Sequence, residues 1–364
     1  MAPKLVVLVV TKDVAEFLLY QPVVALLRAE GYSVTVIAEG LSLGKWLALG
    51  ESVYGGVPEN TKVNQETGCR YDIEEHAVID ELVPDLVLTG LGVSINLGER
   101  FGLAANERGI KLGFVIDVWG AESRSSAVPD FICALDQFGR DKIKQHLLYQ
   151  HRMPHIHITG SPAMDRLVSV EPDECVLTVA ARYDLCVLLA GQDESTTPII
   201  NGLSEALDVL SAGGERFLLI PRLHPKFLAR EDLQTLWLKA LARVSCDVLW
   251  VSPKVSTAQL MCSAEITVST YSNALLEAAA LGSTPVSWVS DVGRAKMRQS
   301  LGGIERFPLV DCGCAIEVST PEEFLAITPE CRDQVREQCG KVYRNDGKNA
   351  ERVVNVMKRE FALS

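Results

Sequence analysis

Short apolar runs alternate with amphipathic stretches along the whole chain. The first run, Leu5 to Val10, is a continuous series of mostly branched aliphatic residues, as in parallel strands that are buried on both faces. Asp13 and Glu16 then have capping-box spacing, and an amphipathic helical stretch follows through about Glu30. Strands that alternate with helices in this way predict right-handed βαβ units and a doubly wound parallel sheet.

The alternation occurs in two series, separated by a turn-forming stretch at 171–174. The expected strands are 5–10, 33–38, 85–89, 111–117, 131–135 and 155–159, then 185–190, 217–220, 247–251, 265–269 and 284–288. We therefore expect an α/β protein with two Rossmann-like domains, 1–168 and 184–328, whose parallel sheets face a central cleft. A charged helical tail, 329–364, follows, and in folds of this kind such a tail can pack back across the first domain.

Composition narrows the class of protein. The chain has 364 residues and is 48% hydrophobic, which is ample for two packed cores. Its formal net charge of −12 comes without a basic block, so we expect no nucleic-acid partner. The opening apolar run is too short for a secretory signal, and no later run approaches the ~20 residues that span a bilayer. We expect a cytoplasmic protein, with peripheral contact to a membrane surface left open.

The ten cysteines include no Cys-x-x-Cys pair, and several lie in apolar runs. We interpret them as buried, reduced thiols that pack as small core residues. Cys312 and Cys314 are the one pair close enough in sequence to suggest a metal or redox role, and no matching pair occurs elsewhere.

Polar residues follow two of the expected strands in the second series. His224 and Pro225 come after strand 217–220, with Arg222 and Lys226 on either side. An imidazole held there between two cations can donate hydrogen bonds to a phosphate. The alternative is a solvated strand-to-helix turn that contains a histidine.

Ser272 and Asn273 stand where a helix should begin after strand 265–269, so their polar groups and the free backbone N–H groups form a possible anion site. Glu277 lies one turn further along the same helix face and can accept hydrogen bonds from ribose hydroxyls. An ordinary helix cap explains the serine and the alanines that follow, but not a carboxylate in so apolar a helix.

These segments resemble known motifs. The string from Ser272 to Val286 resembles the Ser-Ser/Thr-x-x-x-Glu-Ala-x-x-x-Gly-x-Pro-Val signature of GT-B fold glycosyltransferases and their relatives. His224-Pro225 is similar to the His-Pro motif of bacterial sialyltransferases, Kdo transferases and CDP-glycerol glycerophosphotransferases, which use cytidine-activated donors. The segment from Thr159 to Asp165 resembles the Gly-x-Pro-x-x-Asp element that closes the N-terminal domain in many of these proteins.

The resemblance implies a donor site in the second domain. His224 would contact the donor phosphates and act in catalysis by neutralising charge on the departing phosphate. Ser272 and Asn273 would bind phosphate oxygens, Glu277 would face the nucleotide ribose, and Arg222 would also bind the donor. It also implies metal-independent chemistry and no cofactor beyond a CMP-, CDP- or UDP-linked donor. The Asp/Glu-Asp/Glu-Gly motif that carries the general base in bacterial sialyltransferases is not evident.

The base is therefore sought at strand ends of the first domain. Asp117 follows strand 111–117 and is the preferred candidate, with Glu99 and Asp13 as alternatives; it can equally cap a turn. We expect three residues near the acceptor. Trp119 would offer an apolar face to a sugar ring, and Glu99 would lie beside the same site. Arg124 would either contact an acidic acceptor or lie on a loop surface.

His155 and His157 share one face of an expected strand, a spacing that a metal could use. No cysteine or carboxylate lies nearby in the sequence, and we expect no metal site. We expect instead a glycosyltransferase that moves a sugar, or a phospho-polyol, from a nucleotide donor to a hydroxyl acceptor. The alternatives are a non-hydrolysing nucleotide-sugar 2-epimerase or nucleotide-sugar hydrolase, and a catalytically silent GT-B-like partner subunit.

Overall fold

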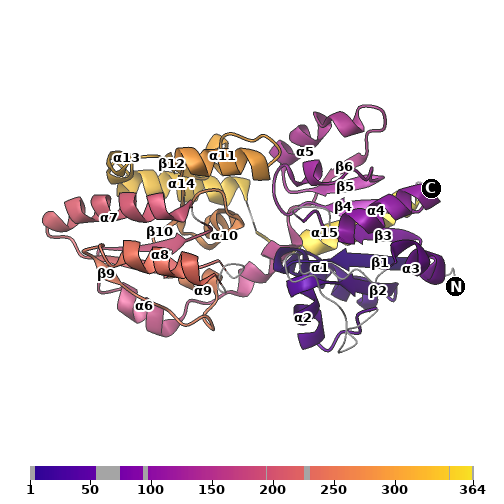
Figure 1. Cartoon of the computed structure of the whole chain (residues 1–364), viewed down its shortest axis with the longest axis horizontal. Coiled ribbons are helices and arrows are strands. Elements are labelled where there is room, and N and C mark those ends of the chain that lie inside the picture. Colours follow the sequence, from indigo (N-terminus) through magenta and orange to yellow (C-terminus); the bar gives the residue numbers. More distant parts are fainter. Residues whose placement is uncertain are drawn as a thin grey trace. The chain divides into compact units, whose positions relative to one another are not determined.

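The computed structural model describes residues 5–54, 74–92, 97–193, 195–224, 230–343 and 345–362, and it contains two compact units (Figure 1). The first unit comprises Met1–Asp165, Ser300–Gly302 and Asp346–Ser364; the second comprises Arg166–Gln299 and Gly303–Asn345. Each unit holds one six-stranded sheet whose strands are all parallel. The expectation of two Rossmann-like α/β domains is confirmed.

The first unit has the strand order β2-β1-β3-β4-β5-β6. Its elements are β1 (Val6–Thr11), α1 (Val14–Ala29), β2 (Ser33–Ala38), α2 (Gly40–Ala48), α3 (Glu75–Leu82), β3 (Leu86–Thr89), α4 (Leu97–Arg108), β4 (Lys111–Val115), η1 (Ala121–Arg124), β5 (Phe131–Ala134), α5 (Gln137–Lys144), η2 (Leu147–Tyr149), β6 (His155–Ile158) and α15 (Asn349–Ala362). The predicted capping box is present: the Asp13 side chain accepts from the backbone N–H of Glu16, whose side chain accepts from the N–H of Asp13.

The C-terminal helix α15 belongs to the core of the first unit, where it packs against α1 (Figure 1). Val353, Val354 and Met357 recur at helical spacing and are buried. The Asp165 carboxylate accepts hydrogen bonds from the backbone N–H groups of Asn349 and Ala350, at 2.9 and 2.8 Å, and so holds the start of α15. The Gly-x-Pro-x-x-Asp segment thus carries the residue that anchors this helix.

The second unit has the strand order β12-β11-β10-β7-β8-β9. Its elements are α6 (Glu174–Ala180), β7 (Leu185–Ala190), α7 (Thr196–Ala212), β8 (Phe217–Arg222), α8 (Glu231–Leu241), β9 (Asp247–Val248), α9 (Thr257–Met261), β10 (Ile266–Ser269), α10 (Asn273–Leu281), β11 (Thr284–Trp288), α11 (Asp291–Ser300), α12 (Pro308–Asp311), β12 (Ile316–Val318), α13 (Pro321–Leu325) and α14 (Pro329–Val342); the 3₁₀ segment η3 (Pro162–Ser169) spans the boundary between the units. Apolar clusters pack on this sheet, and two of them share its strands β7 and β8.

The expected tail over 329–364 is divided between the two units. Helix α14 belongs to the second unit and α15 to the first, so residues 329–364 do not form a separate domain. The difference has a physical cause: each helix has its own buried stripe, Val335 and Cys339 in α14 and the valines of α15, and each stripe is buried within a different unit.

Both sheets have a topological switch point, the place where ligands bind in open α/β sheets. In the first unit the strand order reverses between β1 and β3, and in the second between β7 and β10. Among the described residues, no helix is both long and apolar enough to cross a membrane.

Candidate functional site

The second unit brings the helix-start motif to its switch point. Ser272 is the N-cap of α10, and its side chain accepts from the backbone N–H of Ala274 at 3.2 Å. Asn273 is the first residue of α10, and its Oδ1 is buried without a hydrogen-bond partner among the described residues. A buried acceptor of this kind is unusual in a native protein and calls for a ligand or solvent partner.

Glu277 forms an ion pair with Arg166, which the sequence pattern did not predict. Its Oε1 accepts from Arg166 Nη2 at 2.5 Å, and 18% of its side chain is exposed. Burial raises the pKa of the Glu277 carboxyl, against the lowering effect of Arg166. An ion pair within the second unit therefore explains the carboxylate in this apolar helix. The expected contact with a ribose stays a prediction, and it would involve the other carboxylate oxygen, Oε2.

The loop from β7 to α7 lies beside this motif, and sequence reasoning missed it. Ser269 Oγ donates to the carbonyl of Ala190 at 2.7 Å, so the ends of β10 and β7 are joined. Ser195 is fully buried and its Oγ has no partner among the described residues; the hydroxyl of Thr197 is likewise buried and unpaired. These hydroxyls lie at the N-terminus of a 17-residue helix, where the helix dipole and free N–H groups favour an anion.

A lysine from another element reaches the same loop. Lys296, in α11, lies 2.6 Å from Asp193 Oδ2, and Asp193 Oδ1 accepts from the backbone N–H of Ser195 at 2.9 Å. Although burial raises the pKa of Asp193, the hydrogen bonds from Lys296 and Ser195 lower it overall. The only sequence signal for this region was a Gln-Asp-Glu-Ser-Thr-Thr stretch after a strand, which also describes an ordinary helix start.

Arg222 ends β8, the strand next to β7, and His224 follows that strand. His224 is exposed, whereas Pro225 and Lys226 lie outside the described residues. The Arg222 guanidinium donates to the carbonyls of Ser252, Pro253 and Val255 at 3.2, 3.2 and 2.5 Å. These N–H groups brace the loop after β9, because a strand-end guanidinium can satisfy several carbonyls of an adjacent loop, and the expected donor contact of Arg222 stays a prediction.

The first unit gathers carboxylates at its own switch point. Asp13 and Glu16 follow β1, Gly90 follows β3, and Asp117 follows β4. Glu16 Oε2 accepts from the N–H of Lys12 at 2.5 Å and of Asp13 at 3.3 Å. A Cβ placed on Gly90 would lie 2.4 Å from the Glu16 carboxyl, so the glycine makes room for that side chain. We call Asp13, Glu16 and Asp117 the acidic cluster.

Two members of the acidic cluster, Asp117 and Glu16, have raised pKa values. Burial raises the pKa of Asp117 from 3.8 to about 6; the Arg124 charge opposes this and the Asp13 charge adds to it. Burial, and then the charges of Asp13 and Asp117, raise the pKa of Glu16 well above its ordinary value. Asp117 is therefore mostly ionised at neutral pH while Glu16 keeps its proton, a separation typical of acid–base sites.

The other residues expected in the acceptor site have structural roles. Trp119 is fully buried, and its indole N–H donates to the Asp136 carboxylate at 3.0 Å. It offers no face to a sugar, because an aromatic ring of this size gains more by packing into the core. The Glu99 carboxylate accepts from the N–H and hydroxyl of Ser126, at 3.1 and 2.7 Å, and its expected contact with an acceptor stays a prediction.

Arg124 is not an exposed surface residue. Its guanidinium donates to the carbonyl of Leu91 at 3.1 Å and of Ser300 at 2.7 Å. Its charge nevertheless lowers the pKa of Asp117, which opposes the effect of burial there. Arg124 thus holds two backbone segments beside the acidic cluster, and its expected contact with an acidic acceptor stays a prediction.

The histidine pair binds a carboxylate. His155 Nδ1 lies 2.8 Å from Glu360 Oε2, and His157 Nε2 lies 2.7 Å from Glu360 Oε1. Glu360 comes from α15 and is buried. Within the described ranges, no group of three or more His, Cys, Asp or Glu side chains is arranged to hold a metal ion.

Comparisons with known proteins identify the fold. No family model matches the chain, and no curated protein sequence matches it. Its structure is similar to one from Listeria monocytogenes, described provisionally as a UDP-N-acetylglucosamine 2-epimerase, with TM-score 0.75 and 15% identity over 100% of this chain and 98% of the other. S. aureus MnaA with UDP gives TM-score 0.70 and 14% identity over 99% and 98%.

A glycosyltransferase shows the same architecture at lower similarity. Acinetobacter baumannii MurG matches with TM-score 0.60 and 16% identity, over 98% of this chain and 100% of the other. Sequence identities this low establish a shared fold and nothing finer. The chain has the two-domain GT-B fold that these enzymes share.

Proposed function

We propose that this chain is an enzyme acting on a nucleotide sugar, and that its second unit binds the nucleotide diphosphate. The support is the switch point of that unit, where the N-termini of α7 and α10 follow adjacent strands. Ser195 Oγ, Thr197 Oγ1 and Asn273 Oδ1 are buried there without partners among the described residues. The two hydroxyls and the free backbone N–H groups at these helix N-termini can donate to phosphate oxygens, whereas Asn273 Oδ1 can only accept, for example from a sugar hydroxyl.

We further propose that the reaction is epimerisation of the sugar, the alternative that the fold comparisons favour over transfer. The observation that carries this proposal is the acidic cluster, with one carboxyl ionised and another protonated near neutral pH. The carbon next to the glycosidic carbon can be inverted in two steps. Its proton leaves while the nucleotide diphosphate departs, so that the C–H electron pair forms a double bond. The diphosphate then adds back while a proton arrives on the opposite face. A base and an acid with separated pKa values supply both steps, with Asp117 as the base and Glu16 as the group that holds the second proton.

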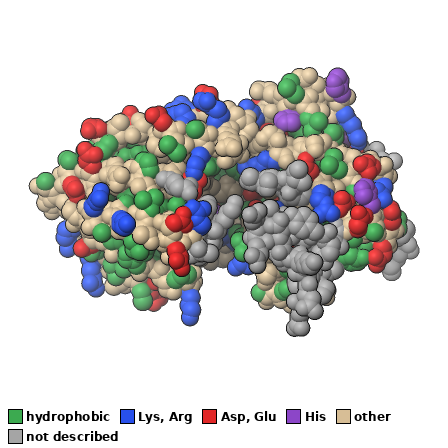
Figure 2. All heavy atoms as spheres, viewed as in Figure 1, with side chains coloured by type: hydrophobic (Ala, Val, Ile, Leu, Met, Phe, Trp, Pro, Cys, Tyr) green, Lys and Arg blue, Asp and Glu red, His purple; other side chains and the backbone are tan. Residues whose placement is uncertain are grey.

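Transfer to a hydroxyl acceptor is the second candidate, since the chain shares its fold with MurG. Asp117 is suited to this reaction as well, because a carboxylate of pKa about 6 can deprotonate an acceptor hydroxyl. Transfer, however, needs one general base and leaves the protonated Glu16 without a use. Binding of nucleic acid is not part of the proposal: on the face shown in Figure 2, the described Lys and Arg side chains are interspersed with Asp and Glu.

The test is product analysis without an acceptor. Purified protein is incubated with UDP-, CDP- and CMP-linked sugars in D₂O, and the nucleotide sugars are separated and examined by NMR. Epimerisation predicts a second nucleotide sugar that carries deuterium at the inverted carbon. Free sugar would indicate hydrolysis, and turnover that begins only when a hydroxyl acceptor is added would indicate transfer.

Nucleotide affinity tests the donor site separately. We expect a thermal shift with UDP or with cytidine nucleotides, and we expect His224→Ala to reduce it, because the exposed imidazole follows β8 at the strand-end edge of the sheet. His151→Ala, which alters an exposed histidine of the first unit, is the matched control. An unchanged affinity in His224→Ala would remove His224 from the site, and no binding to any nucleotide by the parent chain would favour the silent-subunit alternative.

A further inference from the structure

Two cysteines that the proposed function does not use lie together in the second unit. Cys312, Gly313 and Cys314 form the turn between α12 and β12. The Cys314 thiol contacts the Cys312 carbonyl oxygen at 3.8 Å, and its proximity to the Cys312 thiol is the largest cause of the raised pKa of Cys312. Gly313 has φ +74°, a left-handed conformation that glycine adopts at little cost, and it folds the chain back between the two cysteines.

The surroundings hold both sulfur atoms over this turn. Cys312 Sγ lies 3.3 Å from the carbonyl oxygen of Leu309 and 3.9 Å from the hydroxyl of Tyr343. Cys314 Sγ lies 3.8 Å from the carbonyl oxygen of Cys312, so it too points back across the turn. Cys339 Sγ donates to the Cys314 carbonyl at 3.3 Å, which makes it the nearest competitor for either thiol.

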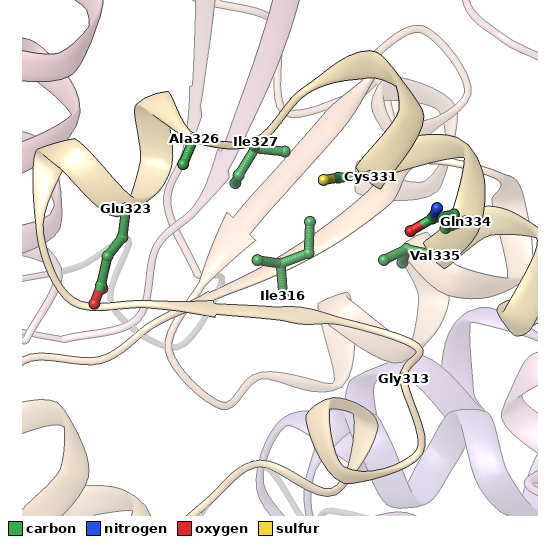
Figure 3. A pocket seen from close by; sticks show the side chains of 8 residues that line it. All are labelled: Gly313, Ile316, Glu323, Ala326, Ile327, Cys331, Gln334 and Val335. Atoms are coloured by element: carbon green, nitrogen blue, oxygen red, sulfur yellow. The ribbon is translucent and has the colours of Figure 1, made fainter.

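The two thiols differ in access. Cys314 is fully buried, whereas Cys312 is only partly buried. A pocket of about 390 Å³ is lined by Gly313 of this turn and by Ile316, Val335 and Cys331 among others (Figure 3). A small reagent can therefore approach the glycine of the turn, and Cys312 is the member of the pair that is partly exposed.

We propose that Cys312 and Cys314 are a redox-active dithiol, which a low-molecular-weight disulfide such as oxidised glutathione converts reversibly to an intramolecular disulfide. First, the Cys312 thiolate attacks one sulfur of the reagent, so a protein–reagent disulfide forms and one reagent thiolate leaves. The Cys314 thiolate then attacks Cys312 Sγ, forming the Cys312–Cys314 bond and expelling the second reagent thiolate. The two protons lost by the cysteines are taken up by the two leaving thiolates, and the reagent is reduced by two electrons.

The chemistry predicts a slow, readily reversed reaction. The neighbouring Cys314 thiol, together with burial, raises the pKa of the Cys312 thiol. Since the thiolate is the attacking form, oxidation should accelerate as pH rises. A disulfide across a single intervening residue closes a small, strained ring, and strained disulfides are the more easily reduced ones.

The test is equilibration of the full chain in mixtures of oxidised and reduced glutathione, followed by acid quenching, thiol alkylation and peptide mapping. In the parent chain we expect the peptide spanning 312–314 to lose 2 Da and two alkylation sites together, and to regain both after dithiothreitol. Cys314→Ser should stop at the glutathione adduct on Cys312. Cys312→Ser should give neither product, because Cys314 is inaccessible.

Controls separate this result from general thiol oxidation. Cys331→Ser removes a thiol from the same corner of the unit and should leave the 312–314 disulfide unchanged. The proposal fails if the parent peptide carries only glutathione adducts, if Cys314 pairs with Cys339 instead, or if both thiols stay alkylatable across the whole range of mixtures. Peptide mapping of the parent chain decides the matter even if a variant does not fold. The outcome is independent of nucleotide-sugar turnover, so it can fail while the proposed function stands.

Discussion

Replacing Asp117 with asparagine should make the protein more stable at neutral pH and abolish its turnover. Asp117 is partly buried in the acidic cluster, and its pKa rises from 3.8 to about 6 on folding. The folded state then keeps a proton between about pH 4 and pH 6 that the unfolded chain has released. Stability from this group is therefore fully present below about pH 4 and is lost as the pH rises through about 6.

The magnitude follows from the same shift. Each tenfold change in acidity is worth ~1.4 kcal/mol, so the rise from 3.8 to about 6 corresponds to ~3 kcal/mol of folding free energy. Asparagine has nearly the same shape and no charge, so the variant does not lose folding stability as the pH rises. It also removes one of the charges that raise the pKa of Glu16, and that carboxyl should titrate at lower pH in the variant.

The assay is urea unfolding of the parent chain and Asp117→Asn at pH 4 and pH 7. The difference in unfolding free energy should move in favour of the variant by ~3 kcal/mol between the two pH values. Asp141→Asn, at an exposed position of the same unit, should show no such pH-dependent gain. A difference that is the same at both pH values would refute the argument that Asp117 is a destabilised carboxylate. A stabilised variant with full turnover would remove it from the chemistry.

Three further changes test other contacts. Gly90→Ala should displace the buried Glu16 carboxyl from its capping contact and lower both turnover and melting temperature, whereas Gly44→Ala, inside α2 with open space around its Cβ, should leave turnover unchanged. Arg166→Met should lower the free energy of unfolding by about 1 kcal/mol, because it leaves Glu277 unpaired. The double variant with Glu277→Gln should recover most of this loss, and an equal loss in the single and double variants would contradict the ion pair. Glu360→Gln should cost about 1–2 kcal/mol at pH 7, since it weakens the hydrogen bonds from two histidines to α15. Burial raises the pKa of Glu360, but the hydrogen bonds from the two histidines outweigh it and lower the pKa overall. The stability that Glu360 contributes is therefore present above its ordinary pKa of 4.5 and is lost at lower pH. If Glu360→Gln destabilised the protein equally at pH 3, this explanation would be wrong.

Local patterns in the sequence were sufficient for the architecture. Runs of branched aliphatic residues mark strands that are buried on both faces, and the capping-box spacing of Asp13 and Glu16 marks the start of α1; the structure has both. The short edge strand β12 was missed, because Ile316–Val318 is too brief to show a period. The helix-start motif at Ser272 was placed correctly, since a cap depends on residues only a few positions apart.

Partners far apart in the chain could be identified only from the tertiary structure. The carboxylate of Glu277 is explained by Arg166, 111 positions away, and the buried position of Trp119 depends on the packing around it. The acidic cluster likewise joins the ends of β1 and β4, and the raised pKa of Asp117 comes from burial, which no local pattern specifies. The sequence by itself determined which segments become strands, helices and caps, because these depend on neighbouring residues. The fold decided which side chains bind each other and which lose their solvent, and those two factors determine the chemistry of the site.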